Sequence, residues 1–223
     1  MKTVLITGLE KEFDKKLAGV FSRENFTVFS LGEYQAECTA NAVCAAPLGS
    51  DFKKAAAQLK QSAGHIDIYV DVTDVRSAFD SFDVRSGLND NVMRELYDAN
   101  VIRPMAMLEV FYPLLETGQE KRLCYLTSAG ASINETRDTD GYAYKMAKAG
   151  LHNFLQITRN VLAPRGFTLR AFDPMDGEIP QAAAAEAAFN YFIRRRGTER
   201  GDPKRDDETN LVFRDAYGRQ HSW

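Results

Sequence analysis

Short runs of β-branched and aromatic residues alternate along this chain with longer segments whose apolar residues recur every three to four positions. The first pattern is typical of buried strands and the second of amphipathic helices. We therefore expect strands over residues 3–6, 26–31, 42–46, 66–70, 123–126, 167–172 and 210–214. Helices are expected over residues 13–23, 51–62, 89–115, 142–162 and 182–196, the third bent near Pro104.

This alternation of strand and helix is the pattern of βαβ units around a parallel sheet. A chain of 223 residues with 44% hydrophobic content is long enough to bury one substantial core. The expected fold is therefore α/β: one Rossmann-like, doubly wound domain over residues 1–223, with a mostly parallel seven-stranded sheet flanked by helices on both faces.

Charge and cysteine usage exclude several classes of function. The formal net charge is −3 with both signs mixed along the chain, which gives no basic surface for nucleic acid or anionic membrane. The three cysteines and three histidines share no spacing typical of metal ligands, so no metal site is expected. Unpaired thiols and an N-terminal apolar run too short for a leader or a membrane span indicate a cytoplasmic protein.

The strongest chemical signal is Tyr144 followed four residues later by Lys148. Residues at this spacing share one face of a helix, so a phenol and an ammonium can enter the same pocket. A neighbouring cation favours the ionised phenol, and we expect Lys148 to lower the pKa of Tyr144. Ser128, at the end of an expected strand, can hold a carbonyl oxygen, and Ser132 is the alternative.

Together with other motifs, this pair resembles the short-chain dehydrogenase/reductase family. The matching motifs run in the family's order along almost the whole chain. They are Thr7-Gly8, residues 66–70, Asp98-Ala99-Asn100-Val101, Leu126-Thr127-Ser128, the Tyr-x-x-x-Lys helix at Tyr144 and Lys148, and the C-terminal Tyr217-Gly218-Arg219. The resemblance implies a catalytic tetrad of Asn100, Ser128, Tyr144 and Lys148.

The resemblance also implies how such a tetrad works. A hydride would pass between a nicotinamide ring and a carbonyl carbon while Tyr144 exchanges the proton on oxygen. Lys148 would tune the phenol and hold the nicotinamide ribose, and Ser128 would polarise the carbonyl. Asn100 would seat a water molecule in a proton relay.

The glycine-rich turn departs from the family pattern. It reads Thr7-Gly8-Leu9-Glu10-Lys11-Glu12-Phe13-Asp14, with carboxylates at Glu12 and Asp14 where the family has glycines. A carboxylate about 4 Å from a phosphate would cost on the order of 4 kcal/mol at an effective dielectric constant near 20. Lys11 can offset part of that cost.

Two further segments depart from the pattern. Asp71-Val72-Thr73-Asp74 stands where the family has Asn-Asn-Ala-Gly, and Pro174-Met175 replaces its Pro-Gly. The resemblance implies cofactor contacts at Thr7, Gly8, Lys11, Glu12, Asp71, Lys148 and Pro174. A basic residue at Lys11 favours NADP over NAD.

Three functions stay open on the sequence alone. The first is an NAD(P)(H)-dependent oxidoreductase that interconverts a small carbonyl and an alcohol. The second is a relative that has lost the dinucleotide and serves as a binding or scaffold subunit. The third is a non-redox acid/base enzyme. By the same resemblance we expect a homodimer or homotetramer paired through the helices of Asn100 and Tyr144, with Met105, Leu108, Phe111 and Leu151 as compatible apolar residues.

Overall fold

The computed structural model describes residues 1–9, 11–32, 42–44, 52–80, 85, 87–194 and 207–223. Within them one sheet has the strand order β3-β2-β1-β4-β5-β6-β7-β8. The strands are β1 (Thr3–Leu9), β2 (Thr27–Gly32), β3 (Ala42–Cys44), β4 (Ile68–Asp71), β5 (Arg122–Leu126), β6 (Thr168–Asp173), β7 (Phe213–Asp215) and β8 (Gln220–His221). The helices are α1 (Glu12–Arg23), α2 (Phe52–Ser62), α3 (Asp90–Tyr97), α4 (Arg103–Glu116), α5 (Tyr142–Leu162) and α6 (Gln181–Ile193).

The sheet confirms the expected doubly wound, mostly parallel architecture. Strands β1 to β7 pair in parallel, and only the two-residue β8 pairs antiparallel, with β7. The pattern of residues 210–214 predicted the last parallel strand but not β8, because β8 is a short return of the chain through Gly218, whose φ is +79°. Of the expected strand over residues 42–46, the last two positions lie outside the described residues.

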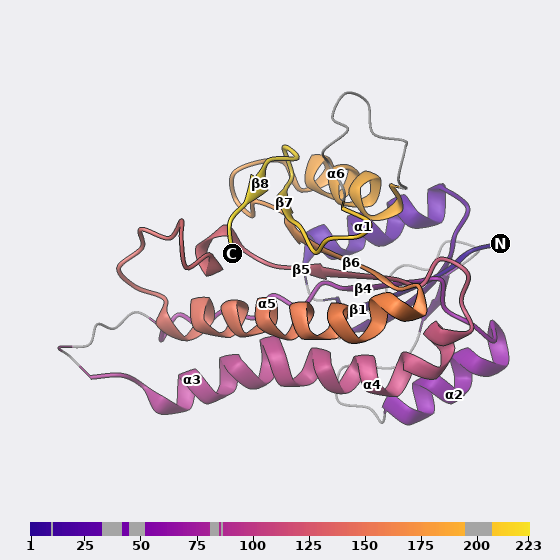
Figure 1. Cartoon of the computed structure of the whole chain (residues 1–223), viewed down its shortest axis with the longest axis horizontal. Coiled ribbons are helices and arrows are strands. Elements are labelled where there is room, and N and C mark those ends of the chain that lie inside the picture. The colour runs from indigo at the N-terminus through magenta and orange to yellow at the C-terminus, as the bar shows by residue number, and fades with distance from the viewer. Residues whose placement is uncertain (10, 33–41, 45–51, 81–84, 86, 195–206) are drawn as a thin grey trace.

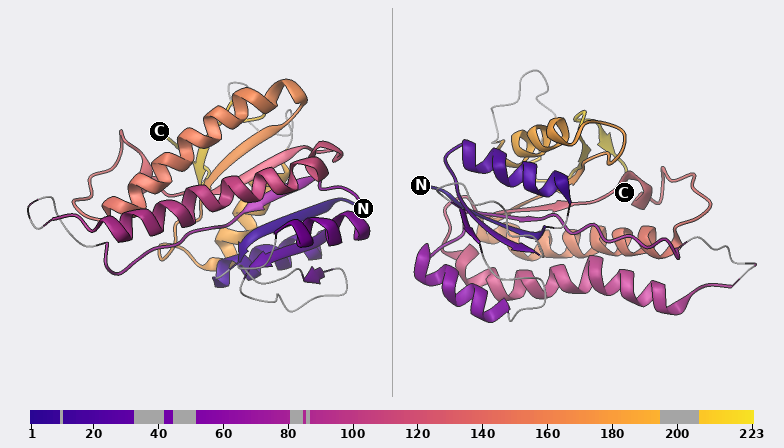
Figure 2. Two further views of the ribbon diagram at one scale, coloured as in Figure 1. Left: turned by 90° about the horizontal axis from the view of Figure 1, so that it is seen from below. Right: turned by 180° about the vertical axis from the view of Figure 1, so that it is seen from behind.

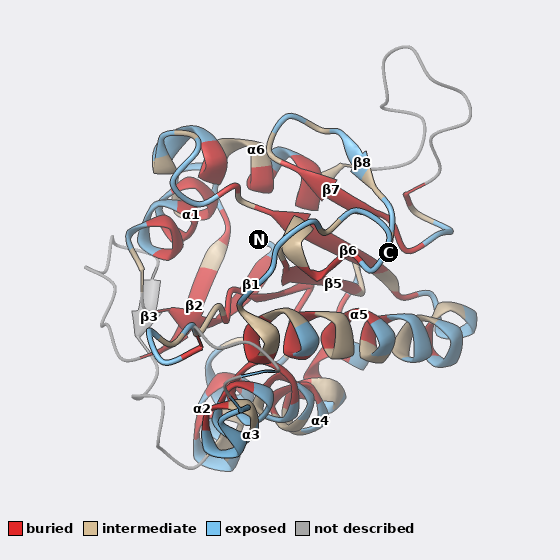
Figure 3. Ribbon diagram, turned by 90° about the vertical axis from the view of Figure 1, so that its left-hand side faces the viewer, coloured by how far each residue is buried: buried red, intermediate tan, exposed pale blue. Residues whose placement is uncertain are grey.

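Helices cover both faces of the sheet, as Figure 1 shows and the two further views in Figure 2 bear out. One face carries α2, α4 and α5, whose core with the sheet includes Leu59, Phe111 and Leu151. The other face carries α1 and α6, which bury Phe21 and Phe189. In Figure 3 the central strands β1, β4, β5 and β6 and the inward sides of these helices are buried, so the sheet is the middle layer of three. Within the described part of the chain, none of the helices combines the length and apolarity that crossing a membrane requires.

The long helix expected over residues 89–115 is divided into α3, a π-helical turn at Asp98–Ile102 and α4. Pro104 lies in the first turn of α4 and has no N–H to donate to the carbonyl of residue 100. In the wider turn Arg103 N–H instead donates to the carbonyl oxygen of Asp98, five residues back. The irregularity expected at the proline therefore falls one turn before it, and it carries the buried Asn100.

Candidate functional site

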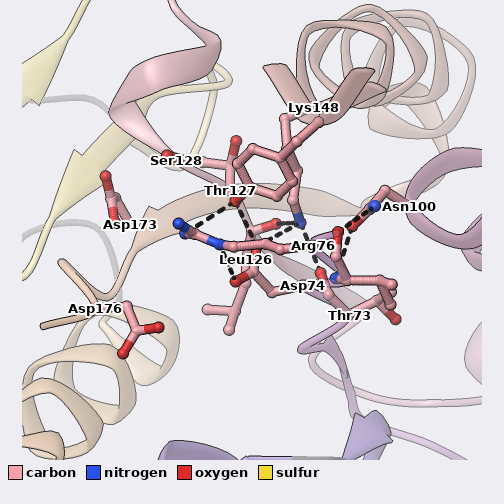
Figure 4. Close-up of polar contacts among 12 residues, drawn as sticks. Thr73, Asp74, Arg76, Asn100, Leu126, Thr127, Ser128, Lys148, Asp173 and Asp176 are labelled. Carbon is pink, nitrogen blue, oxygen red and sulfur yellow. Dashed lines mark hydrogen bonds and ion pairs between the residues drawn. The ribbon is translucent and has the colours of Figure 1, made fainter. Parts of the chain in front are cut away.

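The candidate site lies at the carboxyl edge of the sheet, where the strand order reverses between β1 and β4. Doubly wound sheets bind ligands at such a point because the loops diverge there and leave a crevice. Figure 4 shows the polar side chains that gather there: Asp74 and Arg76 follow β4, Ser128 follows β5 and Lys148 comes from α5. Segments far apart in the sequence thus meet at one edge.

The expected acid/base pair is present on α5, but the carboxylate of Asp74 contacts both of its members. Both Tyr144 and Lys148 are buried. The Tyr144 hydroxyl donates a short hydrogen bond to Asp74 Oδ1. Lys148 Nζ donates to the carbonyl oxygen of Thr73 at 2.6 Å and to that of Leu126 at 3.3 Å, and lies 3.6 Å from Asp74 Oδ1. Asp74 therefore contacts both members of the pair.

Arg76 completes the surroundings of the phenol. Its Nη2 donates to Tyr144 Oη at 3.2 Å, and its guanidinium lies 4.5 Å above the centre of the Tyr144 ring. Its Nε also donates to Asp74 Oδ2 at 3.2 Å. The phenol oxygen thus accepts from a cation and donates to an anion.

The expectation that Lys148 lowers the pKa of Tyr144 is wrong in this conformation. Burial, and after it the Asp74 carboxylate, raise the pKa of Tyr144 well above its ordinary value, and Arg76 and Ser128 offset only part of this. Although burial alone would raise the pKa of Asp74, Lys148, Lys11 and Arg76 hold it well below its usual range. Tyr144 therefore keeps its proton at neutral pH.

Of the two candidate serines, the structure favours Ser128. Ser128 is partly exposed, and its hydroxyl is close enough to hydrogen-bond Tyr144. It also accepts the Gly130 N–H at 3.3 Å. Ser132 is fully buried and caps a turn by accepting the Glu135 N–H at 3.1 Å. A ligand oxygen at Tyr144 can reach Ser128.

Asn100 acts on the loop after β4 and not directly on the phenol. Its Oδ1 accepts the Val75 N–H at 3.1 Å, and its Nδ2 donates to the carbonyl oxygens of Val75 at 2.9 Å and Leu96 at 3.0 Å. These bonds clamp the segment between Asp74 and Arg76. The side chain of Asn100 therefore positions the loop that holds Tyr144.

Asp80, in the loop after β4, positions the helix of Tyr144 and was not among the residues the sequence singled out. Its two carboxylate oxygens accept the N–H groups of Ala143 at 2.9 Å and Tyr144 at 2.8 Å, which lie at the start of α5. A carboxylate there satisfies free N–H groups and complements the helix dipole. Because Asp80 lies far before α5 in the chain, no local capping pattern reveals it.

The two carboxylates of the altered glycine turn lie in different environments. Glu12 is exposed, and it pairs with Lys16 at 3.3 Å on the outer side of α1. Asp14 is buried and accepts the Lys11 N–H at 2.7 Å, which closes the start of the helix. The repulsion expected from Glu12 is therefore weak, whereas Asp14 occupies a helix N-terminal donor.

Lys11 spans the crevice. Its ammonium donates to Asp74 Oδ2 at 2.6 Å and lies 3.7 Å from Asp176 Oδ2. One ion pair thus links the first turn of α1 to the loop that contacts Tyr144. Between them remains a cavity of about 10 Å³, lined among others by Asp14 and Pro174. This is room for about one water molecule.

Position 8 requires glycine for two reasons, its backbone conformation and the close approach of Thr73. Its φ is +82°, and a Cβ at this position would lie 2.4 Å from Thr73 Oγ1 and 2.8 Å from the Thr73 nitrogen. We expect Gly8→Ala to lower the free energy of unfolding by about 2 to 3 kcal/mol, from strain plus overlap. Urea unfolding measures this.

Gly177 provides the control for that change, since its φ is +83° and nothing lies within 4 Å of its added Cβ. Gly177→Ala should therefore cost only the backbone strain, on the order of 1 kcal/mol. An equal loss in the two variants would show that the approach to Thr73 contributes nothing.

Thr7 and Asp71 form an internal network. The Thr7 hydroxyl donates to Asp71 Oδ2 at 2.8 Å, and Asp71 Oδ1 accepts the Thr73 N–H at 3.1 Å. Both residues are buried, and burial raises the pKa of Asp71. Their present contacts hold β1 to the start of the loop after β4.

The segment after β6 has a residue with positive φ, the conformation that glycine adopts most easily, although that residue is not glycine. Met175, next to Pro174, has φ +56°, and its N–H donates to Asp173 Oδ1 at 2.7 Å. The other carboxylate oxygen of Asp173 accepts the Ala129 N–H, also at 2.7 Å. Asp173 therefore ties the loops after β5 and β6 together beside Ser128.

Comparison with solved structures identifies the fold of this chain. Carbonyl reductase Sniffer of D. melanogaster matches with a TM-score of 0.80 and 13% identity over the whole of both chains. An oxidoreductase of the short-chain dehydrogenase/reductase family from Brucella ovis, in complex with a partially ordered NAD, matches with a TM-score of 0.66 and 18% identity over 86% of this chain and 93% of that chain. The chain has the short-chain dehydrogenase/reductase fold. The resemblance inferred from the sequence is thus confirmed at the level of the fold.

A third solved structure carries a bound cofactor. NADPH-bound carbonyl reductase from chicken fatty liver matches the short-chain dehydrogenase/reductase fold of this chain with a TM-score of 0.77 and 15% identity, over 100% of this chain and 99% of that one.

The curated relatives match over part of their length. An uncharacterized oxidoreductase of Schizosaccharomyces pombe is 28% identical over 127 residues, which is 56% of this chain and 49% of that protein. One of Saccharomyces cerevisiae is 32% identical over 78 residues, 35% of this chain and 30% of that protein. The chain thus matches about half or less of these relatives' length. No family model matches the sequence.

Proposed function

We propose that this chain is a single-domain NAD(P)(H)-dependent oxidoreductase that interconverts a small carbonyl compound and an alcohol. The observation that carries the proposal is the meeting of Tyr144, Lys148 and Ser128 at the switch point of the sheet. The names of the structural neighbours and curated relatives, carbonyl reductases and oxidoreductases, support the reaction class.

The roles follow from the geometry at the phenol. The bound nicotinamide would supply the hydride. Burial and Asp74 keep Tyr144 protonated in the free protein, and Tyr144 would donate that proton to the carbonyl oxygen once Asp74 no longer accepts it, which suits the reduction direction. Ser128 donates a hydrogen bond to the same oxygen, and Lys148, whose Nζ lies 5.9 Å from the centre of the Tyr144 ring, adds a positive charge nearby.

The dinucleotide fits the residues of this crevice at one end. Ser128 is partly exposed and offers a donor for a carbonyl, and Tyr144 offers a second one once Asp74 no longer accepts its hydrogen. The buried Lys148 adds a positive charge next to them, and the exposed Glu12 leaves the start of α1 accessible. At the pyrophosphate end, the pair of Lys11 with Asp74 closes the crevice and has to open. Once the pair with Asp74 opens, the positive charge of Lys11 favours the additional phosphate of NADP. Thr7, Gly8, Asp71 and Pro174 would surround the cofactor in the crevice.

Nicotinamide binding is the direct test of this proposal. We expect NADPH to bind the nucleotide-stripped protein with a micromolar dissociation constant, more tightly than NADH, followed by nicotinamide fluorescence and by the melting temperature. Saturation with NADPH at 100 times its dissociation constant should stabilise the protein by about 2.7 kcal/mol.

Absence of binding at millimolar NADPH and NADH would instead favour a second function, a dinucleotide-free binding or scaffold subunit. Two observations support that alternative: Asp14 already occupies a donor at the start of α1, and the cavity beside it holds about one water molecule. Turnover that depends on Tyr144 without nicotinamide would favour a non-redox acid/base enzyme.

We also propose that the chain assembles as a homodimer or homotetramer through the outer side of α3, α4 and α5. A groove of about 480 Å³ there is lined by exposed apolar side chains, among them Tyr97, Met105, Ile157 and Val161. Of the residues the sequence suggested for this surface, Met105 is exposed, whereas Leu108, Phe111 and Leu151 belong to the core. An exposed apolar surface of this kind marks an interaction site.

A further inference from the structure

The carboxylate of Asp74 lies among three cations and a phenol contributed by three separate segments. Its Oδ2 accepts from Lys11 at 2.6 Å and from Arg76 Nε at 3.2 Å, and its Oδ1 accepts from Tyr144 and lies 3.6 Å from Lys148 Nζ. Its side chain is only 9% exposed. A single carboxylate therefore connects the start of α1 with the acid/base pair on α5.

We propose that Asp74 is the selectivity residue of this site: its carboxylate occupies a position that an anionic phosphate group of the ligand has to take over. Only a ligand that brings such a group then frees Tyr144 for proton transfer. This inference rests on the proposed function for the role of Tyr144, but not for the competition between Asp74 and an anion.

The hydrogen bond of Tyr144 is the first reason. A phenol has one hydrogen to donate, and Tyr144 donates it to Asp74. Tyr144 cannot donate to a substrate oxygen at the same time. Proton transfer to a substrate therefore requires the Asp74 carboxylate to move away from the phenol.

The second reason is the accessibility of the groups that hold Asp74. The side chains of Lys11 and Arg76 are 38% and 52% exposed, so an entering anion can reach both. Lys148 is fully buried and fixed by two carbonyl oxygens, and it stays where it is. An anion at the start of α1 thus competes with Asp74 for two accessible cations.

The third reason is the charge around the crevice. Asp176 lies 3.7 Å from Lys11, and Asp71 and Asp173 lie at the ends of β4 and β6. Figure 4 shows Asp173 and Asp176 on the side of Asp74 and Arg76 away from Asn100. Asp74 adds its own charge to the repulsion that these carboxylates exert on an incoming anion, so removal of that charge should strengthen anion binding.

Inorganic pyrophosphate is the probe for this competition, because it contains no nicotinamide. We expect Asp74→Asn to bind pyrophosphate at least about tenfold more tightly than the wild-type protein, measured by the shift in melting temperature. Asp140→Asn, which removes an exposed carboxylate beside Lys145, is the matched control and should bind like the wild type. Lys11→Met in the Asp74→Asn background should abolish the gain.

A second measurement follows the phenol itself. Ultraviolet titration of phenolate absorbance should show Tyr144 ionising at lower pH in Asp74→Asn than in the wild type. Subtracting the same titration of the Tyr144→Phe variant, in each background, isolates this residue among the nine tyrosines.

The outcomes separate this inference from the proposed function. Tighter pyrophosphate binding and an earlier phenol titration in Asp74→Asn support the role of Asp74 even if NADPH proves to be no cofactor. Equal pyrophosphate binding in Asp74→Asn and the wild type overturns it even if NADPH binds and is oxidised.

Discussion

Replacement of Tyr144 by phenylalanine is expected to lower kcat for carbonyl reduction by about a thousandfold, which corresponds to about 4 kcal/mol of transition-state stabilisation. The hydroxyl lies within hydrogen-bonding reach of Ser128, and the residues around it keep it protonated. The phenyl ring keeps the packing of Tyr144 against α3. The dissociation constant of NADPH should therefore change by less than about threefold.

Tyr142→Phe is the control, because Tyr142 lies two residues earlier on the same helix and points to a different side of it. That variant should keep kcat within about twofold. A loss below about tenfold in Tyr144→Phe, with a carbonyl substrate found by screening NADPH oxidation, would remove Tyr144 from the chemistry.

The pH dependence of carbonyl reduction is a second test of the role of Tyr144. Because burial and Asp74 raise the pKa of Tyr144, this phenol keeps its proton through neutral pH. The value of kcat/KM for reduction, which reports the free enzyme, should therefore not fall through neutral pH on account of Tyr144. In Asp74→Asn the loss of rate with rising pH should begin earlier.

The architecture could be predicted because each of its elements has a local signature. Residues 66–70 are buried and apolar except for Asp67, and Tyr142–Leu162 carries apolar residues at helical spacing, so both elements were located to within a few residues. The π-turn at Asp98–Ile102 was not located. A proline indicates that the helix is irregular nearby, but it does not fix which preceding carbonyl oxygen changes its hydrogen-bond partner. The two-residue β8 is too short for any periodicity.

The candidate site was predicted only in part, for a physical reason. The spacing of Tyr144 and Lys148 follows from one helix, whereas their contact with Asp74 depends on how α5 packs across the loop after β4. The sequence showed that Asp71-Val72-Thr73-Asp74 departs from the family pattern. It could not show that Asp74 faces the phenol, and so the sign of the change in the pKa of Tyr144 came out wrong.

Arg122→Met is expected to lower the free energy of unfolding by about 3 to 5 kcal/mol, the usual cost of breaking a buried, hydrogen-bonded ion pair. Arg122 opens β5 and is buried on the face of the sheet that carries α6. Its Nη2 donates to both carboxylate oxygens of Glu208, at 2.8 and 2.9 Å. Its Nη1 donates to the carbonyl oxygens of Phe192 and Arg194, both at 2.7 Å, at the end of α6.

The loss should be large because methionine fills the volume but leaves these acceptors without their donor. Two carbonyl oxygens at the end of α6 and one carboxylate would stay in surroundings poor in water, each at a cost of roughly 1 to 3 kcal/mol where no other donor replaces the guanidinium. Arg170 Nη2 also donates to Glu208 and to the carbonyl oxygen of Arg194, so part of the loss is offset. This remaining arginine keeps the estimate below the sum of the separate costs.

Arg165→Met provides the matched control for this loss. Arg165 pairs with Glu116 at 2.7 Å, but both side chains are about half exposed, and such surface pairs contribute about 0 to 1 kcal/mol. Urea unfolding at neutral pH compares the two variants with the wild type. Equal losses would show that Arg122 acts as a surface charge and that the end of α6 is held by its apolar side chains alone, whereas the expected difference makes Arg122 the residue that joins β5, α6 and the Glu208 segment.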